Sequence, residues 1–290
     1  MRESKLEQLV APGTMRKLAG GFEFVEGPVW HGDDAALIFS DIFGDCMYRY
    51  DPASGEVATY RQPSNKANGN VFDLQHRLVT CEHSTSRVVR QEHDGSLTVM
   101  ASHHNGLELN SPNDIVVDRL GCLYFTDPPY GRLPRVGIER PQLQPVQGVY
   151  RLDPRDSSIV LLADDFDRPN GLCLAEDEQL LYVNDSARMH VRCLEIRGDE
   201  VTGDRIWAQL TGAGPGVADG MKIDSEGNLY CCGPGGVHVF SDAGRFYGVI
   251  RVPEEVANFT WGGEGRKVLY LTASTALYGC QMRVPGRPAW

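Results

Sequence analysis

The sequence contains no apolar run long enough to span a membrane and no stretch with sustained helical periodicity. Its opening segment, MRESKLEQLVAPGTMRKLAGG, lacks the apolar core of a secretory signal peptide. Methionine is scarce, at 7 residues, and aromatic residues make up only 9%. These absences argue against a membrane-spanning protein and against a helical bundle. We expect a soluble, cytoplasmic protein.

Positive charge is also in short supply. The 28 Lys and Arg residues are outnumbered by 39 Asp and Glu residues, and the formal net charge is -11. A surface of this sign repels phosphate backbones. We therefore expect neither nucleic acid nor a membrane as a partner, and we expect a monomer or a homodimer.

Several motifs that carry chemistry are missing. The sequence has no GxSxG nucleophile elbow and no GxxxxGK[ST] phosphate-binding loop. The 8 cysteines form no CxxC pair and no zinc-binding spacing, and most lie in apolar segments, so we expect them to be free and buried. Covalent serine hydrolysis and nucleotide chemistry therefore have no support.

A short, mainly apolar segment that begins with leucine recurs six times. The copies are LIFSD at Leu37, LVTCE at Leu78, LYFTD at Leu123, LYVND at Leu181, LYCCG at Leu229 and LYLTA at Leu269. They start 41, 45, 58, 48 and 40 residues apart, and the longest interval contains the insertion GRLPRVGIERPQLQPVQ. Between them, alternating segments are separated by Asp-Pro and Asp-Gly turns. This repeat predicts an all-β, six-bladed β-propeller with four-stranded antiparallel blades around a central channel.

The whole chain, residues 1–290, is expected to form this single domain, with residues 1–17 as an N-terminal extension. Closed all-β folds of this length commonly form one domain. The segment from Leu18 to Phe24 precedes the first complete repeat, so we expect it to add a strand to the last blade and close the circle.

Each repeat also carries an oxygen-bearing side chain 10 or 11 residues before its leucine. These residues, which we call the polar ring, are Glu26, Asn68, Asn113, Asn170, Asp219 and Asn258. Asn or Asp before Gly is an ordinary turn signal. Six such residues in one register, a Glu among them, instead favour convergence. Because the innermost strands of a propeller line its channel, equivalent positions at their starts should meet around one mouth.

Two carboxylates and four carboxamides in one channel are costly to desolvate unless a cation compensates them. Oxygen ligands of low total charge in a flexible cage fit calcium, whereas zinc prefers His or Cys and magnesium retains more of its water. The sequence therefore predicts one divalent metal ion, with calcium first and zinc, manganese or magnesium as alternatives.

Sequence motifs that follow one another in a characteristic order along nearly the whole chain carry a family resemblance. They include EGPVW, PSNKANGN, LNSPNDIVV, YFTDPPYG, RPNGLCLAED and GPGVADGMKIDSEGNLYC. The chain resembles the family of regucalcin (senescence marker protein), gluconolactonase and luciferin-regenerating enzyme, and especially its bacterial gluconolactonase-like members. That resemblance implies a six-bladed propeller with a single catalytic metal on Glu26, Asn113, Asn170 and Asp219. Departures at IFGDCMY and at residues 74–77 bear on substrate preference more than on metal binding.

The resemblance also implies an activity: metal-dependent hydrolysis of a small lactone, such as the sugar lactone gluconolactone, to its hydroxy acid. The metal would stabilise the oxyanion that forms as water adds, and Asp219 is the candidate general base. A metal-bound hydroxide is the competing nucleophile. Residues that we assign to substrate binding are Asn68, His83, Asn113, Asn258 and Trp261. The segment TDPPYG is expected to shape a loop beside the pocket.

Two other functions fit the same residues. The same metal would polarise a phosphoryl oxygen, which makes a phosphotriesterase that acts on organophosphates one alternative. A propeller that binds calcium without catalysis is the other, because a fold does not settle function. An Asp219→Asn variant separates catalysis from metal binding.

Overall fold

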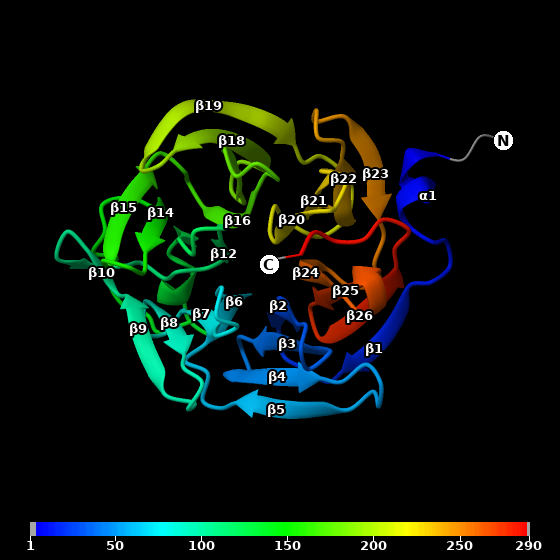
Figure 1. The fold of residues 1–290 in the computed structure, drawn as a ribbon, viewed down its shortest axis with the longest axis horizontal. Helices are drawn as coiled ribbons and strands as arrows, with labels where there is room; N and C mark the ends of the chain where they lie inside the picture. The colour runs from blue at the N-terminus through cyan, green and yellow to red at the C-terminus, as the bar shows by residue number, and fades with distance from the viewer. Residues whose placement is uncertain (1–3, 289–290) are drawn as a thin grey trace.

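Six four-stranded antiparallel sheets surround a central channel in the computed structural model, which describes residues 4–288. Figure 1 looks along this channel, with the first strand of each blade nearest the centre. The predicted all-β, six-bladed propeller is confirmed. No helix within residues 4–288 is long and apolar enough to cross a membrane.

The first five blades are each continuous in sequence, and the sixth takes its outer strand from the N-terminal region. Blade 1 contains β2 (Val25–His31), β3 (Ala36–Asp41), β4 (Cys46–Tyr50) and β5 (Val57–Arg61), and blade 2 contains β6 (Ala67–Phe72), β7 (Leu78–Glu82), β8 (Arg87–Gln91) and β9 (Leu97–Ala101). Blade 3 contains β12 (Ile115–Val117), β13 (Leu123–Asp127), β14 (Gly148–Asp153) and β15 (Ser158–Ala163), and blade 4 contains β16 (Pro169–Leu174), β17 (Leu180–Asp185), β18 (His190–Arg197) and β19 (Glu200–Gln209). Blade 5 contains β20 (Met221–Ile223), β21 (Leu229–Gly233), β22 (Gly236–Phe240) and β23 (Phe246–Ile250), and blade 6 contains β24 (Val256–Gly262), β25 (Val268–Ala273), β26 (Ala276–Gln281) and β1 (Arg16–Gly20). The remaining elements are α1 (Lys5–Leu9), the small hairpin β10 (His103–His104) and β11 (Leu107–Glu108), and the short 3-10 helices η1 (Tyr130–Arg132) and η2 (Glu264–Arg266).

The six repeated segments all form second strands of blades: β3, β7, β13, β17, β21 and β25. These strands are almost entirely buried, because each blade is covered on both faces by its neighbours. Leu172 and Val183 of blade 4, for example, pack in one cluster with Tyr124 of blade 3. A strand buried on both faces needs apolar residues at consecutive positions, which accounts for the composition of the repeat. All eight cysteines are buried and free, as expected.

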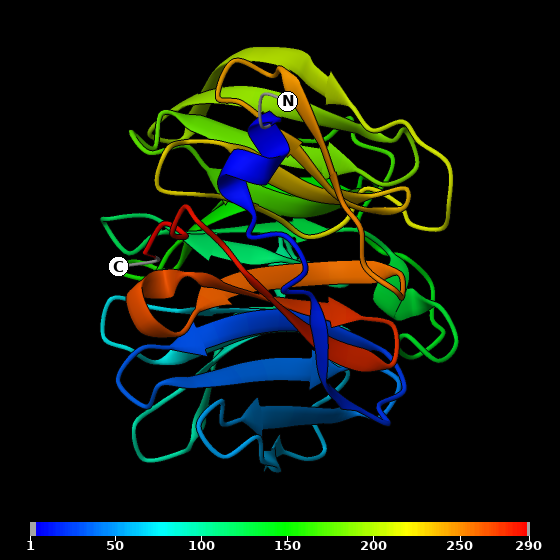
Figure 2. The same ribbon diagram turned by 90° about the vertical axis from the view of Figure 1, so that its right-hand side faces the viewer.

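The N-terminal region closes the circle of blades. β1 pairs antiparallel with β26, so the predicted closing strand is confirmed. It begins at Arg16, slightly before the expected end of the extension at residue 17. The preceding helix α1 has a capping box in which the Ser4 hydroxyl and the Glu7 carboxylate each accept a backbone N–H of the other residue. Figure 2 shows α1 on the outside of the ring next to β23.

Residues 283–288, the C-terminal strap, cross one face of the propeller from blade 6 to blade 4. The backbone N–H of Ser225 donates to the carbonyl of Pro285 at 3.0 Å. The guanidinium of Arg287 donates to the carbonyl of Ala175 at 2.7 Å. In Figure 1 the strap, in red, runs toward the channel axis. It therefore ties three blades together at one end of the channel.

Candidate metal centre

The structure brings the six polar-ring side chains together at one end of the channel, which we call the ring mouth. On one side the amides form a chain: Asn68 Nδ2 donates to Asn113 Oδ1 at 2.8 Å, and Asn113 Nδ2 donates to Asn170 Oδ1 at 2.6 Å. Asn170 in turn interacts with the carboxyl of Asp219. The predicted convergence of these residues is therefore present in the fold.

The two carboxyl groups complete the ring. Glu26 lies within hydrogen-bonding range of Asp219 on one side and of Asn258 on the other. Its side chain is only 3% exposed, and one carboxylate oxygen accepts the backbone N–H of Gly27. Asp219 keeps partial contact with solvent. Amides and acids thus form one continuous cluster in which two carboxyl groups are adjacent.

Glycine next to the ring residues explains how neighbouring blades approach so closely. In four blades the ring residue is followed by Gly27, Gly69, Gly171 or Gly220. A Cβ atom on Gly27 would lie 1.8 Å from the carbonyl oxygen of Asn68, and one on Gly171 would lie 2.2 Å from that of Asp219. Of the four, only Gly27 has a positive φ. The Asn-Gly and Asp-Gly pairs therefore permit close contact between blades instead of forming turns.

The last residue of three repeat segments holds the chain just before a ring residue. Asp127 accepts the backbone N–H groups of Asn110 and Ser111 at 2.8 Å each, shortly before Asn113. Asp185 likewise accepts backbone N–H groups of residues shortly before Asn170, and Asp41 accepts those of residues shortly before Glu26. Blades 5 and 6 end the same segment in Gly233 and Ala273, which have no carboxylate. Three of the four family-implied metal ligands are thus positioned by a buried aspartate.

Charge is concentrated at the ring mouth. Burial and the nearby charge of Asp114 raise the pKa of Glu26 from 4.5 to about 7. Burial, followed by the charges of Glu26 and Asp114, raises the pKa of Asp219 well above its usual range. Ionisation of one of these carboxyl groups makes ionisation of the other less favourable. A cation bound between them would stabilise the ionised form of both.

His83 contacts the ring and Trp261 does not. His83 Nε2 lies 3.1 Å from Asn113 Oδ1 and 3.3 Å from Asn68 Nδ2. Burial lowers the pKa of His83 to about 4, so its imidazole is neutral at pH 7. Trp261 is 4% exposed and lines a cavity at the opposite end of the channel. The structure therefore does not bring Trp261 to the ring mouth, because β24 carries it three residues down the channel from Asn258.

Three side chains that the sequence analysis did not single out also belong to this region. Asp114 is buried, one residue beyond Asn113, and its charge acts on both ring carboxyls. Ser186 accepts a hydrogen bond from Asn170 Nδ2 at 3.0 Å and donates to the carbonyl of Ala218. Tyr130, from the TDPPYG segment, interacts with Ser186, and burial raises its pKa to about 12. The register of ring residues could not identify them, because each lies outside the repeated position.

The insertion in blade 3 forms a wall beside the ring mouth. Gly131 packs so closely on His83 that a Cβ atom would lie 2.6 Å from the His83 carbonyl oxygen. The buried guanidinium of Arg132 fixes this segment by donating to the carbonyls of Asn110 and Pro141 at 2.7 Å each. The TDPPYG segment therefore lies beside the ring mouth.

The donor set fits a hard divalent cation. Glu26, Asn113, Asn170 and Asp219 offer only oxygen ligands, of which two are carboxylates. Within residues 4–288 no group of three or more His, Cys, Asp and Glu side chains is placed to hold a metal.

Comparison with known proteins places this site in a family. Residues 24–275 match the family described as the SMP-30/Gluconolactonase/LRE-like region. The chain belongs to this family. A gluconolactonase from Zymomonas mobilis is 30% identical over 283 residues, covering 89% of this chain and 78% of the relative. Regucalcin from Xenopus laevis is 27% identical and covers 87% of this chain and 84% of the relative.

Solved structures agree with this assignment. A gluconolactonase from Xanthomonas campestris has a TM-score of 0.90 and 30% identity, and the likeness covers 97% of this chain and 93% of that one. The family resemblance predicted from the ordered segments is confirmed.

Proposed function

We propose that the protein is a metal-dependent lactonase, a carboxylic ester hydrolase that opens a sugar-type lactone such as gluconolactone to its hydroxy acid. The observation that carries the proposal is the convergence of six oxygen-bearing side chains, two of them carboxyls, at the ring mouth of a family member whose relatives include proteins named gluconolactonase. One divalent ion, with calcium as the preferred candidate, would be held by Glu26, Asn113, Asn170 and Asp219.

A divalent ion in this position supplies Lewis-acid polarisation of the lactone carbonyl. The chain's own residues do the remaining work. Asp219 accepts a proton from the attacking water while the water oxygen bonds to the carbonyl carbon. The ring C–O bond then breaks, and the leaving alkoxide takes up a proton to become the hydroxyl of the product.

Asp219 suits the part of general base because of its surroundings. Burial and the neighbouring Glu26 raise its pKa, which brings a carboxylate closer to the basicity that proton abstraction at neutral pH requires. A bound cation acts against this shift, so the working pKa reflects both influences. Partial exposure leaves Asp219 accessible to water from the ring mouth.

Substrate hydroxyls would meet Asn68, His83 and the insertion that packs on His83. Neutral His83 can hydrogen-bond a sugar hydroxyl without adding positive charge beside the cation site. Asn258 borders the opposite side of the ring, next to Glu26. Trp261 has no part in this proposal because it lies at the far end of the channel.

Two further properties complete the proposal. Calcium is supported by the oxygen-only donor set, with zinc, manganese and magnesium as the alternatives. The eight free cysteines fit a protein folded in a reducing compartment, and a cytoplasmic location accords with this.

The test is hydrolysis of a panel of aldonolactones, aromatic lactones and phosphotriesters, with calcium or after chelation with EDTA. We expect calcium-dependent acid release from an aldonolactone, and a loss of about 100-fold or more in kcat for Asp219→Asn while calcium still binds. Preferential turnover of a phosphotriester would replace the lactonase with a phosphotriesterase. Calcium binding with no turnover of any substrate would favour a non-catalytic propeller.

A further inference from the structure

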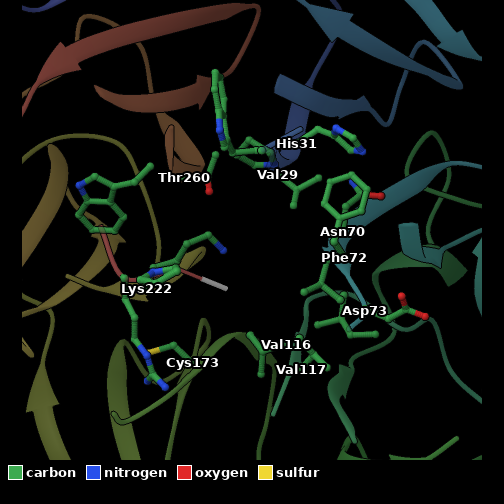
Figure 3. Close-up of a pocket in the computed structure, with 18 of the residues that line it drawn as sticks. Val29, His31, Asn70, Phe72, Asp73, Val116, Val117, Cys173, Lys222 and Thr260 are labelled. Carbon is green, nitrogen blue, oxygen red and sulfur yellow. The ribbon is translucent and has the colours of Figure 1, made fainter. Parts of the chain in front are cut away.

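The far end of the channel holds a cavity of about 310 Å³ that the proposed reaction does not use. We call it the exit cavity. All six innermost strands line it, through residues such as Val29, Val71, Ile115, Cys173, Lys222 and Thr260. Its volume lies at the lower end of the range in which proteins bind small molecules. Figure 3 shows Lys222 and Thr260 extending toward its open centre.

The acidic residues around this cavity are paired with basic ones, whereas two of its basic residues are not paired within the described part of the chain. Its acidic residues all have basic partners: Asp33 pairs with His76 at 2.7 Å, and Asp73 pairs with Arg77 at 2.8 Å. Glu178 lies 3.6 Å from Arg287 of the C-terminal strap. None of these carboxylates therefore remains to balance another cation.

Two cations in the cavity have no such partner. Among residues 4–288, no side chain forms an ion pair or a hydrogen bond with Lys222 Nζ or with the Arg266 guanidinium. Lys222 has only the longer-range attraction of buried Asp114. Both residues are half-buried, and burial lowers the pKa of Arg266. In a chain of net charge -11, two half-buried cations that no carboxylate of the described residues contacts mark a place where an anion would be stabilised.

The same wall offers an unused donor. Trp261 Nε1 is buried and, within the described chain, has no hydrogen-bond acceptor. The C-terminal strap lies directly on this indole, since a Cβ atom on Gly286 would come within 2.2 Å of it. A buried N–H without an acceptor costs free energy, so its retention beside two unpaired cations is consistent with an acceptor supplied from outside.

We propose that the exit cavity binds a small organic anion, a carboxylate with an apolar body, between Lys222 and Arg266. The carboxylate would satisfy the two cations, and the apolar body would pack on Val29, Val71, Ile115 and Ile223. Inorganic phosphate would meet the cations but leave these apolar walls in contact with water. This site is separate from the ring mouth and does not rest on the lactonase proposal.

The experiment is isothermal titration calorimetry of the full chain with octanoate, its neutral analogue octanamide, and inorganic phosphate. EDTA is present throughout, so that no metal at the ring mouth can bind the carboxylate. We expect octanoate to bind at least about 10-fold more tightly than octanamide and than phosphate.

Variants locate the binding. Lys222→Met and Arg266→Gln should each weaken octanoate by about 10-fold or more, whereas Arg245→Gln, which removes an exposed cation elsewhere, should leave it unchanged. If Lys222→Met does not fold, Arg266→Gln decides, because the Arg266 side chain makes no hydrogen bond with residues 4–288 that the substitution could break. The proposal is wrong if octanoate does not bind, or if octanamide or phosphate binds as tightly as octanoate. It is also wrong if a folded Arg266→Gln variant retains full affinity for octanoate.

Discussion

The two ends of the channel present opposite chemistry on the same six strands. At the ring mouth, acids and amides face one another and the side chains hydrogen-bond mutually, with two carboxyl groups side by side. At the exit cavity two cations, Lys222 and Arg266, are set among apolar side chains, and no side chain of residues 4–288 pairs with either. A strand that passes from one end to the other therefore changes from an acidic to a basic, apolar environment within about five residues, or ~17 Å at the usual rise.

The contrast shows how a propeller separates sites. Successive side chains on an inner strand reach different depths of the channel, so a residue number within the strand corresponds to a depth. Asn258 lies beside Glu26, whereas Thr260 and Trp261 on the same strand line the exit cavity. Asp114 interacts with both Glu26 and Lys222 and so lies where the two environments meet.

Removing one ring carboxylate should produce the largest effect. Glu26→Gln keeps the shape of the side chain but deletes one of the two charges. We expect calcium affinity and lactone hydrolysis both to fall by more than about 100-fold, which exceeds the loss caused by changing a residue that only positions a metal ligand. Calorimetry with calcium and a pH-stat assay measure the two losses. The exposed Glu56→Gln is the matched control, and equal behaviour of the two variants would rule out Glu26 as a ligand.

Ser186→Ala should weaken the ring mouth indirectly. Ser186 accepts a hydrogen bond from Asn170 Nδ2 at 3.0 Å and so orients its carboxamide. We expect calcium affinity to fall by about 10-fold without loss of folding, as for other residues that position metal ligands. Ser225→Ala, on an exposed turn, provides the comparison. Unchanged affinity in Ser186→Ala would mean that Asn170 is positioned by the backbone alone or does not bind metal.

The acidic end should also make stability depend on pH in the metal-free protein. The pKa of Glu26 is raised from 4.5 to about 7, so the folded state binds its proton more tightly than the unfolded state. The free energy of unfolding should therefore fall as pH rises through this window, by on the order of 3 kcal/mol for this group. Urea denaturation in EDTA measures this slope.

Two controls accompany the pH series. Saturating calcium should remove the decline, because a bound cation stabilises the ionised carboxylates of the folded state. Glu26→Gln should flatten the profile in EDTA. A wild-type stability that instead rises between pH 4.5 and 7 would show that the ring carboxyls are not coupled as the structure indicates.

The smallest effect is expected where blades are joined. Thr126 Oγ1 donates to the carbonyl of Asn170 in the next blade at 2.7 Å, in a fully buried position. Thr126→Val should lower the free energy of unfolding by about 1–3 kcal/mol, because the buried carbonyl loses its partner. Thr211→Val, at an exposed site, should change it by less than about 0.5 kcal/mol. Similar free energies of unfolding for both variants would mean that the hydrogen bond between Thr126 and Asn170 does not contribute measurably to stability.

Sequence periodicity was sufficient for the architecture but not for the depth of each residue in the channel. The repeat placed all six second strands and the ring register correctly, because burial on both faces imposes the same composition on every blade. The sequence predicts that Trp261 binds substrate, yet a few residues along an inner strand carry its side chain to the other end of the channel. The repeat does not identify Asp114 and Ser186, because their contacts form between blades and no single repeat encodes such contacts.

Crystals soaked in calcium would test the central claim most directly. We expect one anomalous peak per chain at the ring mouth, about 2.3–2.6 Å from oxygens of Glu26, Asn170 and Asp219. Absence of a peak under saturating calcium, or a peak bound by none of these three side chains, would contradict it.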